Sequence, residues 1–304
     1  ARAAAAFQIC LTVHNSLVCG AILKAGTDEQ KKRWLPKLAS GEWIGAYSLS
    51  EPGSGSDAGS LSTSAMADGA QYVLNGTKSW VSSAGFADLF VVFVSTDRTK
   101  GSRGVSCLVV EKGAPGLSLG KKEKKMGVRG SDTRELAFKD ARVPQADRLG
   151  AEHEGFKVAL AVLDSGRIGI AAQSVGVARA AFEEALAYAK ERQQFGKPLS
   201  EFQATRFKLA DMALAIDAAR LLTWRAAAAF AKGRATTEAS MAKLFASETA
   251  NKVAYEAVQL HGGNGYIREY AVERYFRDAR VSTIYEGTSE VQRLVIAREL
   301  LRGA

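Results

Sequence analysis

The sequence predicts an α+β fold in three parts: short N-terminal helices, a middle β domain and a C-terminal helical bundle. Two observations carry this prediction. Residues 43–148 alternate between apolar and polar side chains with many intervening turns, which is typical of a small antiparallel barrel or sandwich. From Glu152 onward the apolar residues recur at helical spacing almost to the end, as in an up-and-down bundle of four or five helices.

The first part, up to about residue 40, has an Ala-rich helical start. Thr27 to Gln30 form a helix-capping pattern before a basic turn that ends at Pro36. In the second part, residues 70–74 and 77–81 predict a β-hairpin with Asn75 and Gly76 as its turn. Residues 89–94, 105–110 and 134–138 are further strand candidates.

Breakers and apolar spacing divide the third part into helices. Pro198 separates the first two long helices, and Gly262-Gly263-Asn264-Gly265 breaks the third. One face of the second helix is marked by apolar residues at helical spacing, namely Phe207, Ala210, Leu214, Leu221 and Trp224.

Composition excludes several classes of protein. Apolar residues make up 47% and charged residues 24% of the 304 residues, which is ordinary globular usage. No uninterrupted apolar stretch approaches the roughly 20 residues of a membrane span. The formal charge of +9 indicates an anionic ligand or partner, which could be nucleic acid, a phosphate-bearing molecule or an acidic protein. The three cysteines and three histidines follow no metal-ligand spacing, so we expect reduced thiols and no metal.

Familiar catalytic motifs are missing from the sequence. It contains no GxGxxG between a strand and a helix, and no GxxxxGK[ST], GxSxG or SxxK. A Rossmann nucleotide site and the common hydrolase classes therefore have no support.

A Gly/Ser-rich loop, YSLSEPGSGSD at residues 47–57, follows a predicted strand. Glycine lets backbone amides approach a ligand closely, so this loop can line a polar ligand. By itself the pattern is also that of a plain surface turn.

The segment TKSWVSS at residues 77–83 places Trp80 beside several hydroxyl groups. An indole next to hydrogen-bond donors suits a planar heteroaromatic cofactor. A tryptophan on a strand is otherwise more often part of the core.

The segment IYEGTSEV at residues 284–291 places Glu286 just before the last helix, which Thr288 or Ser289 can cap. Burial would raise the pKa of this carboxyl group and the helix dipole would lower it. A carboxylate in that setting can act as a general base for a weakly acidic carbon. The alternative is an ordinary acidic residue at a helix start.

Read together and in order, YSLSEPGSGSDAG, TKSWVSS, ERQQFGKPL, QLHGGNGY and DARVSTIYEGTSEVQRL resemble the acyl-CoA dehydrogenase family of flavoenzymes. The resemblance extends from residue 10 to the end and is greatest to the short-chain (butyryl-CoA) subgroup. It implies an N-terminal helical domain of which residues 1–42 are a remnant, a middle antiparallel β-barrel at 43–150 and a C-terminal four-helix bundle at 151–304. The chain would therefore lack some N-terminal helices of the family.

The resemblance implies that Glu286 removes the α-proton of an acyl-CoA thioester while the β-hydride passes to flavin N5, which gives a trans-2-enoyl-CoA. The alternative base position of some relatives is occupied here by Gly166, which cannot act as a base. Substrate contacts carried over from the family are Ser56, Asp164, Arg167, Tyr285 and Gly287.

The resemblance also implies FAD as cofactor. Its contacts would be Tyr47, Leu49, Ser50, Trp80, Val81, Ser82, Arg192, Gln194, Phe195, Gln203, Gln259, Gly262, Gly263, Thr288, Ser289 and Glu290, those from Arg192 to Gly263 serving a neighbouring subunit. Because a neighbouring subunit would complete the FAD site, we expect at least a dimer, and the resemblance implies a tetramer. Ser82 and Ser83 replace the usual Thr and Asn, but Ser82 keeps a hydroxyl group.

Partners and location follow from the same resemblance. We expect electron-transferring flavoprotein as the acceptor and a bacterial cytoplasmic or mitochondrial matrix location. Two alternatives stay open: an acyl-CoA oxidase-like enzyme that uses oxygen, and a nucleic-acid-binding relative on the same scaffold. The intact YEGT glutamate argues against the second, and FAD and CoA phosphates account for the positive charge without nucleic acid. Acyl-chain preference is open.

Overall fold

A computed structural model describes residues 5–302, which form two compact units. One unit comprises Ile9–Lys124 and Gly130–Gly166, and we call it the β unit. The other comprises the chain from Arg167 onward together with Lys125–Arg129 and the segment ending at Gln8, and we call it the helical unit. Each is described by itself.

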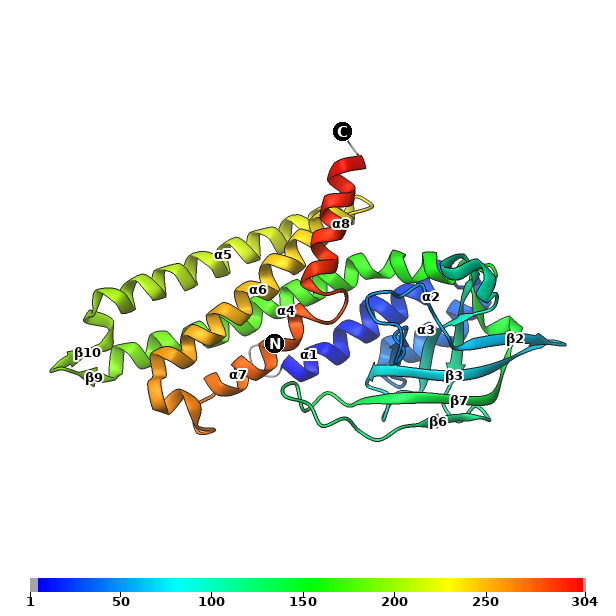
Figure 1. Ribbon diagram of the computed structural model, residues 1–304, viewed down its shortest axis with the longest axis horizontal. Coiled ribbons are helices and arrows are strands. Elements are labelled where there is room, and N and C mark those ends of the chain that lie inside the picture. The colour runs from blue at the N-terminus through cyan, green and yellow to red at the C-terminus, as the bar shows by residue number, and fades with distance from the viewer. Residues whose placement is uncertain (1–4, 303–304) are drawn as a thin grey trace. The chain divides into compact units, whose positions relative to one another are not determined.

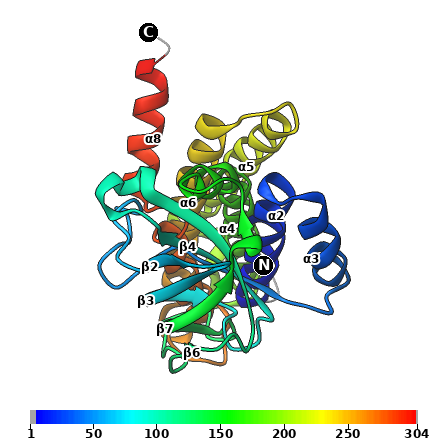
Figure 2. The ribbon, with the colours of Figure 1, turned by 90° about the vertical axis from the view of Figure 1, so that its right-hand side faces the viewer.

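The N-terminal part is helical, as predicted. It contains α1 (Ala5–Thr12), a π-helical turn η1 (Val13–Cys19), α2 (Gly20–Ala25) and α3 (Asp28–Ser40). Thr27 and Gln30 form a reciprocal capping box at the start of α3. Pro36, however, lies inside α3 and does not end it. The helix ends at Gly41, whose φ of 76° is the left-handed conformation that glycine adopts without a Cβ clash. Figure 2 shows α2 and α3 next to each other.

His14 fixes the entry into the sheet. Its Nδ1 accepts a hydrogen bond from the Gly45 amide at 3.0 Å, and its Nε2 lies 3.0 Å from the Leu38 carbonyl oxygen. The first bond defines the tautomer, so Nε2–H donates to Leu38. A Cβ on Gly45 would lie 2.4 Å from Val18, so only glycine fits where the strand meets the helix. Strand β1 (Gly45–Ser48), which carries Tyr47, is thereby held at a fixed position against the N-terminal helices.

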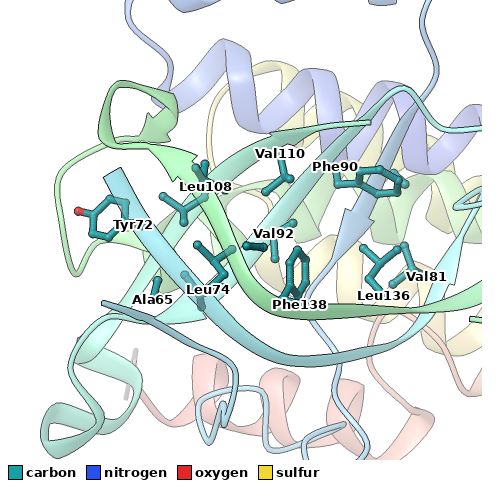
Figure 3. Packing of buried hydrophobic residues seen from close by; sticks show 14 of the residues in the cluster. Ala65, Tyr72, Leu74, Val81, Phe90, Val92, Leu108, Val110, Leu136 and Phe138 are labelled. Atoms are coloured by element: carbon teal, nitrogen blue, oxygen red, sulfur yellow. The ribbon is translucent and has the colours of Figure 1, made fainter. Parts of the chain in front are cut away.

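The β unit contains a single sheet in the order β6-β7-β3-β2-β4-β5-β8, with β1 paired to β4. The strands after β1 are β2 (Ser64–Asp68), β3 (Gln71–Ser82), β4 (Leu89–Ser95), β5 (Val105–Glu111), β6 (Leu117–Leu119), β7 (Thr133–Pro144) and β8 (Arg148–Leu149). The pairs are antiparallel as predicted, except that β1 and β2 pair parallel with β4. Strands β1 and β2 therefore run in the same direction, because the long loop from Leu49 to Thr63 carries the chain back between them. Figure 3 shows the strands bending around a core that includes Tyr72, Phe90, Leu108 and Phe138.

The predicted hairpin turn at Asn75-Gly76 is wrong. Strand β3 runs straight through both residues, and the turn lies at Gly69-Ala70 between β2 and β3. Gly76 instead sits at a register shift against β7, with φ at 141°. A Cβ there would lie 2.6 Å from Thr63 Cα, so this glycine permits a close backbone approach and a bulge, not a reversal.

The helical unit is built on three long helices, α4 (Gly155–Glu191, which begins in the β unit), α5 (Gln203–Ala231) and α6 (Thr236–His261). A short hairpin, β9 (Gln193–Gln194) and β10 (Lys197–Pro198), joins α4 to α5. The shorter helices α7 (Val272–Ala279) and α8 (Ser289–Arg302) follow. In Figure 1 the long helices lie side by side and α8 stands steeply to them.

Small side chains form the interior of the helical unit. Ala171, Ala219, Ala226, Ala242 and Ala246 cluster there, and alanines let helix axes approach closely. The large apolar face that marked α5 in the sequence is on the outside instead. Phe207, Leu214, Leu221 and Trp224 are each more than half exposed in the single chain. Such a continuous exposed apolar face is typical of a protein–protein contact.

Two helical stretches, Ala5–Ala25 and Gly155–Glu191, are long and apolar enough to pass a length-and-hydropathy test for a membrane span. In the most apolar 18-residue part of each stretch, about half of the residues are buried within the protein (44% and 56%). A helix packed in a protein interior passes the same test, so length and composition alone do not make either stretch a span.

Candidate functional site

The Gly/Ser loop begins where β1 ends. Tyr47 lies on β1 with its ring centroid 5.0 Å from that of Phe93. The carbonyl of Leu49 accepts a hydrogen bond from Lys78 Nζ at 3.1 Å, and that of Ser50 accepts one from the Ser79 amide at 2.9 Å. The predicted ligand loop is therefore attached to β3, the strand that carries Trp80. Ser56 lies further along the loop and is exposed.

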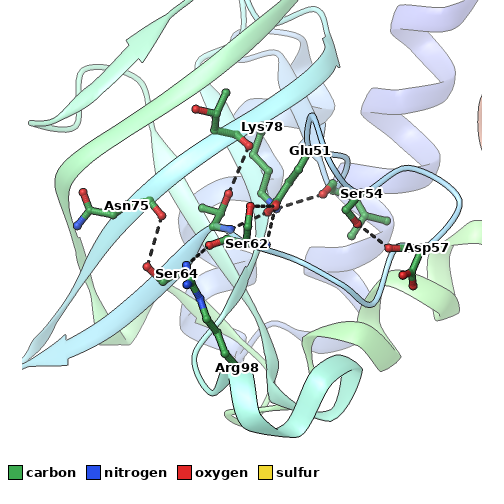
Figure 4. A network of polar contacts seen from close by, with 11 residues as sticks. Glu51, Ser54, Asp57, Ser62, Ser64, Asn75, Lys78 and Arg98 are labelled. Atoms are coloured by element: carbon green, nitrogen blue, oxygen red, sulfur yellow. Dashed lines mark hydrogen bonds and ion pairs between the residues drawn. The ribbon is translucent and has the colours of Figure 1, made fainter.

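A fully buried ion pair organises this loop (Figure 4). Lys78 Nζ lies 2.7 Å from Glu51 Oε1, and the two side chains are 0% and 1% exposed. Glu51 also accepts hydrogen bonds from the amides of Ser62 (2.6 Å) and Thr63 (3.0 Å). This ion pair thus ties the start of the Gly/Ser loop, at Leu49 and Glu51, to the segment just before β2, at Ser62 and Thr63.

The two groups stay charged at neutral pH. Burial pushes the pKa of Glu51 upward, but the Lys78 charge and the hydrogen bonds from Lys78 and Ser62 outweigh it and lower the pKa to about 2. Burial lowers the pKa of Lys78 to about 8, against the opposing effect of Glu51. Both values leave the pair ionised at pH 7.

Trp80 occupies a bulge in β3. Residues Lys78 and Val81 pair with Leu136 and Arg134, so two residues of β3 oppose one of β7. Trp80 has φ at 60°, an uncommon conformation for a non-glycine residue, and its side chain is 66% exposed. The bulge therefore presents the indole outward from the sheet.

The residues after Trp80 divide between core and surface. Val81 is 1% exposed and belongs to the β core, so only its backbone can contact a ligand. Ser82 is half-buried. Ser83 has φ at 68°, and its Oγ is buried with no hydrogen-bond partner among the described residues. An orphaned buried hydroxyl beside an exposed indole is an arrangement that a polar, planar ligand can satisfy.

Asp164 and Arg167 lie three residues apart on α4 and are 8% and 5% exposed. Arg167 NH1 donates to Ser240 Oγ at 3.3 Å. The simpler interpretation of these two residues, an exposed ion pair on the helix surface, does not fit such burial. Buried charged groups need specific partners.

Glu286 lies in the turn before α8. Thr288 caps that helix, because its Oγ1 accepts a hydrogen bond from the Val291 amide at 3.3 Å, as the sequence allowed. Glu286 and Gly287 have φ at 51° and 90°, so two consecutive residues are in the left-handed region. Tyr285, just before them, donates its hydroxyl to Gln173 Oε1 at 3.1 Å.

The carboxyl group of Glu286 is buried, and its Oε2 has no hydrogen-bond partner among the described residues. Burial raises the pKa of Glu286 to about 7, while the charges of Lys243 and Arg167 lower it. A carboxylate with a pKa near 7 and a free lone pair is poised for proton transfer at neutral pH. Of the other residues expected around it, Ser289 is buried and Glu290 is exposed.

Two side chains that hold this turn are absent from the residues predicted from the sequence. Lys243 on α6 is 0% exposed, and its Nζ donates to the Gly287 carbonyl at 2.7 Å. Gln292 on α8, also 0% exposed, donates Nε2 to the carbonyl oxygens of Glu286 (3.1 Å) and Gly287 (2.9 Å). The signal for Lys243 was in the sequence, because it falls on the same helical face as the buried Ala239, Ala242 and Ala246.

A second group of predicted residues lies at the other end of α6. Arg192 directly precedes the β9–β10 hairpin, and Gln194 and Phe195 lie in it. Phe195 and Gly196 have positive φ, and the Phe195 side chain is 93% exposed. Gln259, Gly262 and Gly263 end α6, and Gln203 begins α5, all of them exposed. Tyr188 joins these ends of the helices, because its ring stacks on His261 at 4.1 Å.

The helix α6 separates the two groups. From Lys243 to His261 is 18 residues, which at 1.5 Å per residue is about 27 Å. The structure therefore does not bring Arg192, Gln203 or Gln259 to Glu286 within one chain.

A cavity of about 340 Å³ lies between α4 and α5, away from both groups. Its charged lining residues pair with each other along each helix, Arg179 with Glu183 at 2.7 Å and Arg220 with Asp217 at 3.2 Å. None of the predicted site residues lines it. We therefore do not assign the active site to this cavity.

Comparison with known proteins decides the family. Sequence models of acyl-CoA dehydrogenases match the chain in all three of their domains, the N-terminal domain over residues 1–42, the middle domain over 46–141 and the C-terminal domain over 153–301. The chain belongs to the acyl-CoA dehydrogenase family. Its fold class and its assignment as an oxidoreductase of this flavin-dependent family are thereby confirmed.

Individual proteins are similar to nearly the whole chain. The mitochondrial short-chain specific acyl-CoA dehydrogenase of Bos taurus is 52% identical over 302 residues, which cover 99% of this chain and 73% of the relative. Subunit CarC of the caffeyl-CoA reductase-Etf complex of Acetobacterium woodii is 48% identical over 303 residues, or 99% of this chain and 80% of the relative. The solved butyryl-CoA dehydrogenase of Megasphaera elsdenii has a TM-score of 0.98 and 46% identity, covering 99% of this chain and 79% of that one.

The residues present fit the flavin that acyl-CoA dehydrogenases use. An isoalloxazine has a flat apolar face and an edge of heteroatoms, which call for an aromatic neighbour and hydrogen-bond donors. The β unit supplies the exposed indole of Trp80 and, three residues later, the buried hydroxyl of Ser83, which has no hydrogen-bond partner in the part of the chain that the structure describes. In the helical unit, Ser289 Oγ at the start of α8 is likewise buried with no partner among the described residues.

Proposed function

We propose that this protein oxidises a short-chain acyl-CoA to the trans-2-enoyl-CoA, with Glu286 as the base. The observation that carries the proposal is the buried carboxyl group of Glu286, whose Oε2 has no partner among the described residues and whose pKa burial raises to about 7. The short-chain preference is supported by the names of the relatives, a short-chain specific enzyme and a butyryl-CoA dehydrogenase.

In the proposed reaction, Glu286 Oε2 takes the proton from the α-carbon of the thioester. The electron pair of that C–H bond forms the α,β double bond, and the hydrogen on the β-carbon leaves with its two electrons. The bound flavin supplies the acceptor for this hydride. A carboxylic acid remains on Glu286, and a pKa near 7 makes both the uptake and the later release of the proton easy.

The α-proton of a thioester becomes acidic enough only if the enolate oxygen is stabilised as charge develops. We propose that the backbone N–H of Glu286 donates a hydrogen bond to this oxygen. The fixed left-handed turn at Glu286 and Gly287 supports this role, because a preorganised donor needs a rigid backbone. Tyr285 would flank the reacting carbons, and Ser56, Asp164, Arg167 and Gly287 would hold the thioester.

We infer that FAD is the flavin, and that one chain supplies only part of its site. Tyr47, Leu49, Ser50, Trp80, Val81 (through its backbone), Ser82, Thr288, Ser289 and Glu290 would contact it in the same chain. Arg192, Gln194, Phe195, Gln203, Gln259, Gly262 and Gly263 would contact the FAD of a neighbouring subunit. The separation of about 27 Å along α6 supports this division.

We further propose a homotetramer. The exposed apolar face of α5, which includes Phe207, Leu214 and Trp224, supports a contact between subunits. Electron-transferring flavoprotein is the proposed acceptor, in line with the relative that is a subunit of a reductase-Etf complex. One relative is mitochondrial and others are bacterial, so we place the protein in a mitochondrial matrix or a bacterial cytoplasm.

The experiment is anaerobic mixing of the purified yellow protein with butyryl-CoA, with the flavin absorbance followed near its visible maximum. The wild type should bleach, and Glu286→Gln should lose bleaching by at least about a thousandfold in rate while it keeps its flavin. Glu269→Gln, an exposed carboxylate of the same unit, is the matched control and should bleach normally. Normal bleaching by Glu286→Gln would refute the base assignment, and steady peroxide formation in air without an added acceptor would favour oxidase chemistry.

A further inference from the structure

Helix α6 carries a stripe of polar side chains on a buried face. Ser240, Lys243, Ser247 and Asn251 follow one another at intervals of three, four and four residues, so they lie along one side of the helix. The first three are 0% exposed. A buried lysine is costly unless it has a specific partner, so this stripe has a purpose beyond packing.

The stripe holds the chain segment that leads to the base. Asn251 Nδ2 donates to the Ala279 carbonyl at 3.0 Å and lies 3.3 Å from Ser282 Oγ. A little over two turns earlier on α6, Lys243 Nζ donates to the Gly287 carbonyl at 2.7 Å. The stretch from Ala279 to Gly287 is thus fastened to α6 at both ends.

The fastening at Gly287 acts on Glu286 directly. Left-handed φ values at two consecutive residues, one of them a glutamate, persist only where the surroundings enforce them. The Gly287 carbonyl has two donors, Lys243 Nζ and Gln292 Nε2. Gly287 itself has φ at 90°, which residues with a side chain rarely adopt, and a Cβ there would displace the Gln292 amide, 2.7 Å away. The peptide after Gly287 is therefore fixed from two helices, α6 and α8, and Gln292 also holds the peptide after Glu286.

Lys243 also interacts with Glu286 through its charge. Of the two charges that lower the pKa of Glu286 against its burial, that of Lys243 is the larger, ahead of Arg167 on α4. Burial lowers the pKa of Lys243 to about 8, and the charge of Glu286 is the main influence raising it. The ammonium group is bonded to a carbonyl oxygen and not to the carboxylate, so it attracts the negative charge without occupying the lone pair of Oε2.

We propose that Lys243 is the positioning residue of the base: it fixes the Glu286–Gly287 turn through the Gly287 carbonyl and holds Glu286 in its ionised form through its charge. The inference rests on the proposed role of Glu286 and adds a second residue to it. In this arrangement Lys243 can stabilise the charge of Glu286 while Oε2 stays available to take a proton. A direct ion pair would not allow both, because a carboxylate bonded to the ammonium group would be a poor base.

Three variants test this. Lys243→Met removes the charge and the donor, and Lys243→Gln removes the charge but keeps a donor for the Gly287 carbonyl. Lys252→Met, an exposed lysine on the same helix, is the matched control. The charged and titratable groups that bear on Glu286 and Lys243 and stay in place are Arg167 on α4, Glu248 on α6, Tyr285 in the turn and Glu290 on α8.

Two measurements are made on the flavin-loaded protein. The first is kcat/KM with butyryl-CoA as a function of pH. The second is an infrared titration of the protonated carboxyl stretch of Glu286, identified by its loss in Glu286→Gln. Removing a nearby opposite charge should raise the apparent pKa of Glu286 by about one unit. In both Lys243 variants, the fall of kcat/KM at low pH (the acid limb of the profile) and the infrared titration should therefore shift to higher pH. Below both limbs, kcat/KM should be about tenfold lower than in the wild type.

An acid limb that stays in place in either Lys243 variant overturns the proposal, even if activity falls, because a merely structural loss lowers the plateau without moving the limb. A limb that moves in Lys252→Met as well also overturns it. The infrared titration needs no turnover, so it tests the effect of Lys243 on the pKa of Glu286 separately from the role of Glu286 as the base. If Glu286→Gln keeps full activity, the assigned base is wrong, whereas an inactive Glu286→Gln with unshifted Lys243 variants refutes the role of Lys243 alone.

Discussion

Two lysines among the residues that the structure describes are fully buried, Lys78 and Lys243, and they interact differently with their neighbouring carboxylates. In the β unit, Lys78 forms a closed ion pair with Glu51 at 2.7 Å, and Glu51 accepts further hydrogen bonds from Ser62 and Thr63. In the helical unit, Lys243 bonds to a backbone carbonyl, while Oε2 of the nearby Glu286 has no partner among the described residues. The chemical groups are the same in both places, but only one carboxylate has its lone pairs occupied.

The consequence is opposite in sign for the two glutamates. The pKa of Glu51 falls to about 2, because its partners outweigh the effect of burial, and the pKa of Glu286 rises to about 7, because burial outweighs the more distant charges. The first carboxylate is fixed in one charge state and can only hold structure. The second can exchange a proton at neutral pH. An ammonium group in direct contact, together with the hydrogen bonds on the carboxylate, thus separates the structural carboxylate from the reactive one.

The largest effect on stability is expected when the closed pair is broken. Lys78→Met leaves Glu51 charged, buried and without its ammonium partner, which costs about 3–5 kcal/mol of unfolding free energy. Lys139→Met, an exposed lysine of the same unit, should stay within about 0.5 kcal/mol of the wild type. Urea unfolding of the three proteins measures this. Equal midpoints for Lys78→Met and Lys139→Met would show that the pair contributes nothing net.

The second prediction concerns the pH dependence of stability, where the two glutamates act in opposite directions. The pKa of Glu286 is raised from 4.5 to about 7, so its contribution is fully present below pH 4.5 and is lost as the pH rises to about 7, by about 3 kcal/mol. The depressed pKa of Glu51 gives stability that is present above pH 4.5 and is lost as the pH falls toward about 2.

The unfolding free energies of the wild type and Glu286→Gln, measured by urea titration from pH 4.5 to 8, isolate the first of these contributions. Relative to the variant, the wild type should become less stable as the pH rises through this range. A constant difference between the two proteins would mean that Glu286 keeps an ordinary pKa in the folded state.

Much of this architecture could be predicted from the sequence, because the signals were local. The helix caps at Thr27 and Thr288 and the strand alternation each depend on residues a few positions apart. The prediction of a turn at Asn75-Gly76 was wrong because Gly76 is required by the close approach of a distant residue, Thr63, and not by a reversal of its own segment. Packing across the sheet overrode a strong local turn signal.

The candidate site shows the same limit. Glu286 could be assigned through a motif of adjacent residues, but Lys243 is 43 positions away and Lys78 is 27 positions from Glu51. Alternation along β3 does place Lys78 on the same side as the buried Tyr72 and Leu74, which indicates an inward charge but not its partner. The partner of a buried charge depends on the tertiary fold, so residue patterns along the chain leave it open.

The smallest effect on stability is expected from Gln292→Leu, and it tests whether the open carboxylate depends on its backbone. The variant removes the donor to the Glu286 carbonyl but leaves Lys243 on that of Gly287. Leaving one buried carbonyl unpaired costs about 1–3 kcal/mol, and the loss should be at the lower end because Gln292 Oε1, itself without a partner among the described residues, disappears too. The turn should loosen, so kcat should fall about tenfold or more with little change in KM, since a small displacement of a reacting group is expensive. Unfolding and steady-state kinetics on the same preparation decide it, and a stability loss with unchanged kcat would mean that Gln292 supports the helix start and not the base.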